Sequence, residues 1–254
     1  VLAGYGPTTR EKLEENRRVL GEALRLAVGC DDSAVSFRES AKGEYAGLTC
    51  VDGQLTGSLR GVEIPMRGFA AAKSSAVSTL LIHPQGAGAL DADLVRALAA
   101  AGHALHAIDP FGCGKNIAEQ KAQEPRGSSP FFTTFNRTDD AERIYDIALA
   151  VRYLLAASSA QVQIVGLGAA GLWALAAAAV LGPQDRLLRF ALDLNEFDTA
   201  SAAAYLNDLP IPGILRAGGL ANAAALAAPH DTLLHNGGER FDCTWAEMAY
   251  ALYP

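Results

Sequence analysis

The spacing of apolar residues changes twice along the chain. From Thr8 to Val28 they recur at helical spacing among charges, which predicts an amphipathic helix within an N-terminal arm, residues 1–33. Residues 34–70 then hold short apolar runs that predict antiparallel strands joined by turns. These strands are expected at 46–51 and 59–64, separated by Asp52-Gly53 and Gly57 and ended by Pro65.

Beyond Ser74 short apolar runs typical of strands alternate with longer runs of helical period. Strands are predicted at 77–83, 103–109, 161–165, 188–194 and 232–234, and helices at 89–101, 139–157 and 169–181. This alternation predicts an α/β fold with a mostly parallel sheet covered by helices on both faces. We therefore expect residues 34–254 to form the sheet and its helices, and residues 1–254 to be a single domain.

Composition narrows the class of protein. A chain of 254 residues that is 50% hydrophobic can bury a full core, and its net charge of −7 without a basic run argues against a nucleic-acid surface. The longest apolar stretch, 169–181, is shorter than the roughly 20 residues of a membrane span, and no secretion signal opens the chain. Four dispersed cysteines form no C-x-x-C pair, so no zinc or redox motif is expected. Their pattern does not indicate a cellular compartment.

Chemistry in such a sheet is expected just after the strands, because ligands bind beyond the carboxyl ends of parallel strands. All five segments that follow the predicted strands are polar or glycine-rich. They are residues 83–86, 109–114, 166–171, 193–196 and 235–238.

The glycine turn at 166–171 has two interpretations. Gly166-x-Gly168-x-x-Gly171 matches a dinucleotide-binding fingerprint, for which Asp193 would hold a ribose and NAD or FAD would be the ligand. The same turn also fits the nucleophile elbow G-x-S-x-G, a sharp strand-to-helix turn that presents a serine above a sheet.

The order of motifs favours the elbow. The segments Leu81-Ile82-His83-Pro84-Gln85-Gly86, 131–138, 165–175 and Leu226-Ala227-Ala228-Pro229 resemble the α/β-hydrolase superfamily, and within it the acetylxylan-esterase and dienelactone-hydrolase-like branch. The resemblance extends over residues 40–250. It implies a three-layer sandwich, ester hydrolysis, and oxyanion donors at the loop of His83 and Gln85 and at the elbow residue Ala169.

The chain departs from this pattern at the nucleophile. Gly168 stands where the serine is expected, and glycine has no oxygen or sulfur with which to attack a carbonyl. The resemblance also implies a histidine after the last strand, whereas His235 ends the fifth predicted strand and the sequence closes at Pro254. We therefore expect an apparently truncated C-terminal end without the histidine loop.

Each remaining candidate has a structural and a catalytic interpretation. His83 is expected to brace its own turn through a backbone hydrogen bond, and Asp109 to hold its own loop. Cys113 is either a displaced nucleophile or a small loop residue. Asp193 and Glu196 either orient a histidine or cap a helix that begins near Thr199.

His235, with Glu239 and Asp242, is too loosely spaced to predict a metal site, so no metal or cofactor is expected.

These patterns predict an esterase-like domain that has lost its catalytic serine and histidine and serves a binding or structural role, as a domain or subunit of a larger esterase-like protein. The first alternative is an active hydrolase of carbohydrate or small acyl esters that uses Cys113, or a water activated by Asp193, Glu196 or His235. The second is dinucleotide binding at the glycine turn. Neither nucleic acid nor a membrane is expected as a partner, and a secreted or periplasmic origin is compatible with the resemblance.

Overall fold

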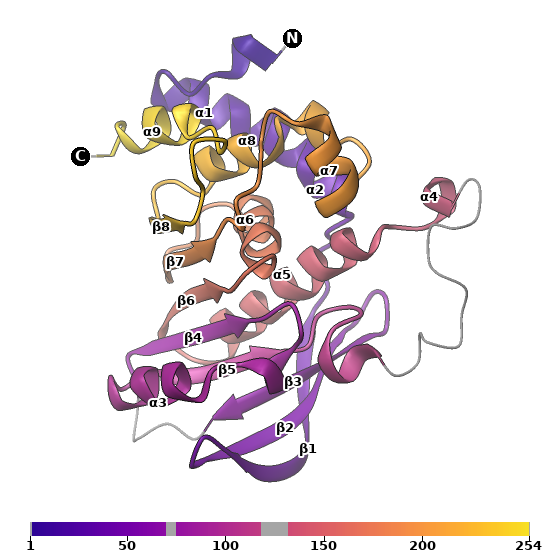
Figure 1. Ribbon diagram of the computed structural model, residues 1–254, viewed down its shortest axis with the longest axis vertical. Coiled ribbons are helices and arrows are strands. Elements are labelled where there is room, and N and C mark those ends of the chain that lie inside the picture. The colour runs from indigo at the N-terminus through magenta and orange to yellow at the C-terminus, as the bar shows by residue number, and fades with distance from the viewer. Residues whose placement is uncertain (1, 70–74, 118–131, 254) are drawn as a thin grey trace.

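A computed structural model describes residues 2–69, 75–117 and 132–253. Its centre is an eight-stranded sheet with the order β1-β2-β3-β5-β4-β6-β7-β8 (Figure 1). The strands are β1 Val35–Tyr45, β2 Leu48–Gly57, β3 Val62–Phe69, β4 Val77–Ile82, β5 Ala104–Ile108, β6 Gln161–Gly166, β7 Leu187–Asp193 and β8 Asp231–His235. Strands β4 to β8 are parallel, and β1 to β3 extend the sheet in antiparallel fashion.

The parallel part of the sheet was predicted to within one or two residues. Its long helices are α3 Ala92–Ala100, α5 Asp139–Ala157 and α6 Ala170–Leu181. Helix α6 is buried along its length and contacts β4, β6 and β7, so its small alanine side chains lie against the sheet. The five-residue strand β8 begins and ends one residue outside its predicted bounds.

The antiparallel strands differ from the prediction. Asp52-Gly53 lies inside β2, and the turn before β2 is Ala46-Gly47 with positive φ at both residues. Pro65 was expected to end a strand but lies within β3. Proline lacks only the N–H donor, and the Pro65 carbonyl accepts the N–H of Asp109 at 2.9 Å.

The N-terminal arm is helical from Arg10 to Val28, as predicted. It consists of α1 Arg10–Asn16, a π-helical turn Arg17–Gly21 and α2 Glu22–Val28, with Thr9 as its N-cap and Gly29 at its end. The arm packs beside α8 and α9 (Figure 1). Asn16 is fully buried and donates to the side chain of Asn222 on α8 at 2.7 Å.

Of the helices between and after the last strands, sequence reasoning placed only one, expected to begin near Thr199. These helices are α7 Ala202–Asp208, α8 Gly219–Leu226 and α9 Thr244–Tyr250, with the short α4 Phe132–Phe135 before α5. Single 3-10 turns occur at Leu2–Tyr5, Ala87–Ala89, Gly114–Ile117 and Ile214–Ala217. The helix cap expected of Asp193 or Glu196 is wrong, because α7 begins later and Ser201 caps it by accepting the N–H of Ala204.

None of the helices described is long and apolar enough to cross a membrane. All four cysteines are free thiols.

Candidate functional site

The glycine turn between β6 and α6 is a sharp strand-to-helix turn. Gly168 has φ +51°, the left-handed conformation that marks the strained residue of a nucleophile elbow. A Cβ atom built at Gly168 would meet only the Pro84 ring, 3.6 Å from its Cγ. The turn therefore has the elbow geometry and room for a side chain but no side chain.

The other two glycines of the turn are required by packing. A Cβ atom at Gly166 would lie 2.7 Å from the Cα of Gly171, and one at Gly171 would overlap the main-chain oxygen of Asp193 at the end of β7. The close approach of α6 to β6 and β7 thus accounts for the spacing of the first and third glycines.

The loop after β4 lies against the elbow through Pro84. Its first residue, His83, accepts the N–H of Gln85 at its Nδ1 atom, at 3.1 Å, as the bracing interpretation expects. Partial burial lowers the pKa of the His83 imidazole.

Asp109, directly after β5, joins the loops that follow β4 and β5. Its two carboxylate oxygens accept the N–H of Ala87 at 2.5 Å and the N–H of Lys115 at 2.9 Å. Gly86 and Gly114 flank the carboxylate so closely that a Cβ atom at either position would collide with it. The carboxylate is buried. It holds its own loop, as predicted, and also holds the loop after β4.

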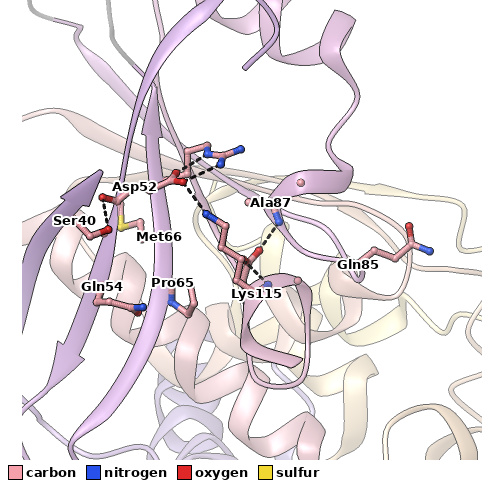
Figure 2. A pocket seen from close by; sticks show the side chains of 13 residues that line it. Ser40, Asp52, Gln54, Pro65, Met66, Gln85, Ala87 and Lys115 are labelled. Atoms are coloured by element: carbon pink, nitrogen blue, oxygen red, sulfur yellow. Dashed lines mark hydrogen bonds and ion pairs between the residues drawn. The ribbon is translucent and has the colours of Figure 1, made fainter. Parts of the chain in front are cut away.

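A cleft of about 330 Å³ lies between these two loops and strands β2 and β3 (Figure 2). We call it the polar cleft. Its polar side chains are Ser40, Asp52, Gln54, Arg67, Gln85, Asp109 and Lys115. Gly168 does not line it, but Gln85 and Pro84 are neighbours in one loop, so the elbow and the polar cleft share that loop.

An ion-pair triad forms one wall of the polar cleft. Asp52 on β2 faces Arg67 on β3 in register, and the guanidinium donates to the two carboxylate oxygens at 2.6 and 3.0 Å. The Lys115 ammonium donates to the same carboxylate at 2.7 Å (Figure 2). The hydrogen bonds from Arg67 and then Lys115 hold the pKa of Asp52 at about 2, against the burial that would raise it.

The ammonium of Lys115 is the accessible part of the triad. The triad has two cations for one carboxylate, and Lys115 is 62% exposed, so its remaining N–H donors are accessible. Gln54 Oε1 is buried and has no hydrogen-bond partner in the described part of the chain.

Cys113 is buried, in the loop after β5. Burial raises the pKa of its thiol, and Sγ donates a weak hydrogen bond to the Phe111 carbonyl at 3.7 Å. Two residues of α5 hold the same loop: Asp146 accepts the N–H of Phe111, and Arg143 Nε donates to its carbonyl.

Asp193 and His235 end the neighbouring strands β7 and β8 in register. Asp193 Oδ1 accepts the N–H of Asn195 and the side-chain N–H of Asn236, at 2.8 and 3.1 Å. Glu196 is exposed and its N–H donates to the Asn236 carbonyl. The structure thus brings Asp193 and His235 side by side, while the carboxylate binds asparagines.

No group of three histidine, cysteine, aspartate or glutamate side chains suited to a metal ion occurs among the residues that the structure describes. The motif segment 131–138 is described from Phe132 onward, so Phe131 lies outside the described residues.

Sequence reasoning missed Asp52, Gln54 and Arg67. Asp52 and Gln54 have the i, i+2 spacing of one strand face, but this signal was masked because Asp52-Gly53 also fits a turn.

Comparisons with known proteins place this geometry in a known fold. No protein-family model and no curated protein matches the chain. Solved structures do match. An acetyl xylan esterase from Paenibacillus sp. R4 has a TM-score of 0.59 and 15% identity over 99% of this chain and 88% of that one. A promiscuous CE15 esterase from a marine bacterial metagenome has a TM-score of 0.66 and 11% identity over 97% and 81%.

A third similar structure contains a sugar ligand. It is a mutant glucuronoyl esterase from Sporotrichum thermophile in complex with methyl 4-O-methyl-beta-D-glucopyranuronate, with a TM-score of 0.54 and 13% identity over 97% of this chain and 73% of that chain. Together with the strand order and the elbow, these matches show that the chain has an esterase-like α/β-hydrolase fold.

Proposed function

We propose that this protein is a non-catalytic member of the α/β-hydrolase fold that binds a carbohydrate in the polar cleft. The observation that carries the proposal is Gly168, which takes the strained conformation of the elbow without supplying a nucleophile. Apart from its chain neighbours, the atoms within 4 Å of the Cβ position of Gly168 belong to the Pro84 ring, which has no nucleophilic group.

The alternative nucleophile is poorly suited to attack. A cysteine attacks as a thiolate, and burial of Cys113 raises its thiol pKa, which disfavours that form. Its neighbours are the Phe111 carbonyl, which accepts a hydrogen bond from the thiol, and the Arg143 guanidinium, which lowers the thiol pKa against the larger effect of burial. Neither group can take up the thiol proton.

The acid and base candidates also support a non-catalytic role. In a catalytic triad the carboxylate accepts a hydrogen bond from the histidine that it orients. Asp193 accepts hydrogen bonds from Asn195 and Asn236 instead, although His235 lies in register beside it.

The chemistry of the polar cleft suits a sugar. Sugars offer many hydroxyl groups, each of which both donates and accepts hydrogen bonds. Asp52 supplies acceptors and Lys115 supplies donors, and the exposed ammonium of Lys115 would pair with the carboxylate of a uronic acid. The cleft volume of about 330 Å³ is within the range of small-molecule sites, and solved structures with this fold include carbohydrate esterases.

An ester-hydrolysis assay tests the absence of catalysis. We expect p-nitrophenyl acetate to be cleaved by the purified protein no faster than by buffer, and Gly168→Ser to remain near that rate because a hydroxyl without an oriented base stays weakly nucleophilic. Robust turnover by the natural chain would overturn the proposal. If such turnover survived in Cys113→Ala, Cys113 would be excluded as the nucleophile, leaving a water activated by Asp193, Glu196 or His235.

A binding titration tests the ligand class. Xylo-oligosaccharides and methyl 4-O-methyl-glucuronate are added to the protein, and binding is followed by calorimetry and by NMR shifts. We expect Lys115→Ala to weaken binding of the uronate about tenfold or more, since one charge-assisted hydrogen bond contributes about 1.5–3 kcal/mol. The matched control is Lys42→Ala on β1, because Lys42 is 73% exposed and outside the cleft. If neither sugar bound, the carbohydrate assignment would be wrong and a structural role would remain.

A further inference from the structure

Strand β8 forms one edge of the sheet. It pairs with β7 and with no other strand of the described chain. An unprotected edge strand is a template for pairing with another chain, and soluble proteins usually protect such edges with charges, prolines or bulges.

The opposite edge, β1, has this protection. It carries Arg38, Glu39, Lys42 and Glu44, and its pairing with β2 shifts register between Glu39 and Ala41. Strand β8 has a single charged residue, Asp231 at its first position, and no lysine, proline or register shift. The two edges of one sheet therefore differ, and β8 is the one suited to pairing.

The main chain of β8 has groups directed outward. The N–H of Leu194 donates to the His235 carbonyl, so the main chain of His235 faces β7. Because hydrogen-bonding direction alternates along a strand, Thr232 and Leu234 direct their N–H and C=O groups away from β7.

The side chains of β8 are nearly symmetric about its centre. Asp231, Leu233 and His235 are exposed on one face, and Leu233 is 62% exposed, which is unusual for a leucine in a strand. Asp231 and His235 stand two residues on either side of Leu233.

We propose that β8 pairs antiparallel with β8 of a second copy of this protein, centred on Leu233. In that register Leu233 faces Leu233 of the other copy, and Asp231 faces His235. Thr232 and Leu234 then form the hydrogen-bonded pairs with their outward main-chain groups, while the exposed side chains occupy the closer, non-hydrogen-bonded pairs.

A second copy fits this edge because the contact is self-complementary. A two-fold axis through Leu233 brings each Asp231 carboxylate to the opposite His235 imidazole, which has an N–H to donate to it, and the apolar side chain to its own copy. Arg189 on β7 pairs with Asp231 at 3.2 Å on its own chain, so the carboxylate is flanked by two donors. A strand of five residues buries a small area, so the dimer is expected to be weak and reversible.

Sedimentation velocity from about 1 to 200 µM tests the proposal. We expect a reversible dimer in the natural protein and a monomer in Leu233→Lys, because two like charges then face each other at the centre of the pair. Leu59→Lys is the matched control, since Leu59 is 68% exposed in the turn between β2 and β3, and it should dimerise like the natural protein.

Disulfide trapping tests the register. In a non-hydrogen-bonded antiparallel pair the Cα atoms lie about 4.5 Å apart, within the range of a disulfide. Leu233→Cys should form a covalent dimer under mild oxidation at least about tenfold faster than Leu59→Cys. The natural protein, oxidised in the same way, gives the background rate that is due to its own four cysteines. A monomer at every concentration, a dimer unchanged by Leu233→Lys, or equal trapping of the two cysteine variants would each overturn the proposal.

Discussion

The main-chain oxygen of Asp193 occupies the space that a side chain at Gly171 would need. This contact fixes the distance between α6 and the end of β7, and with it the elbow. A side chain should therefore lower the free energy of unfolding more at Gly171 than at Gly168.

Gly171→Ala is expected to lower the free energy of unfolding by about 3 kcal/mol, because the added methyl overlaps backbone that cannot move aside. Gly168→Ala is expected to cost only about 1–2 kcal/mol, the strain of a left-handed alanine, since the space beside Pro84 is open. Urea unfolding measures both values.

The control for the glycine series is Gly88→Ala. Gly88 has open space around its Cβ position and no positive φ, so this variant should unfold near the natural midpoint. If Gly171→Ala were as stable as Gly88→Ala, the packing argument for the turn would be wrong.

Lys115→Met is expected to raise the pKa of Asp52 above its value of about 2, because one of its two cationic donors is lost. Arg67→Met should raise it further, since the two hydrogen bonds of Arg67 are the larger cause. NMR titration of the Asp52 carboxyl carbon measures the change, and Lys42→Met serves as the control. An unchanged pKa in Arg67→Met would contradict the ion-pair triad.

Asp146→Asn is expected to stabilise the fold at neutral pH, because the amide removes a charge that burial disfavours. Burial raises the pKa of Asp146 well above 3.8, so the protonated form is the one that the fold favours. The stability that this group contributes is complete below its unfolded pKa and is lost as pH rises through its folded pKa.

The gain in Asp146→Asn should therefore be largest near pH 7 and vanish toward pH 3. Chemical denaturation across this range is the measurement. A gain of equal size at every pH would show that the carboxyl does not titrate as its burial requires.

Cys113 is expected to resist iodoacetamide at pH 8 in the folded protein and to react readily in urea, because it is buried and its thiol pKa is raised. Peptide mass spectrometry distinguishes it from Cys243, which is only half-buried. Faster alkylation of Cys113 than of Cys243 in the folded protein would reveal an activated thiolate and favour the catalytic alternative.

The parallel half of the fold was predictable because, in each of its segments, the period of the apolar residues and the length of the apolar run indicate the same kind of element. The 19 residues of α5 and the strands β4 to β7 combine clear period with flanking polar turns. Helix α8 was not predictable in this way, because its sequence GLANAAAL is nearly all small and apolar and has no distinct polar face. Its helical state depends on packing against α6 and α9.

The sharp strand-to-helix turn was predictable from local sequence, since five adjacent residues define it, while the loss of a nucleophile at Gly168 stays a prediction. The polar cleft was not predictable, because Asp52 and Arg67 lie 15 positions apart and meet only through the register of β2 and β3. The sequence pattern places a turn at Asp52-Gly53, so it does not predict the pairing of β2 with β3. Lys115 joins them from the loop after β5, 63 positions beyond Asp52.

Asp109 holds the loops after β4 and β5 through main-chain N–H groups. Those bonds do not depend on which side chains the loops carry. If the polar cleft binds a sugar as proposed, substitutions at Gln85 or Lys115 would alter recognition while the scaffold keeps its shape, so selection could retune specificity without first rebuilding the loops.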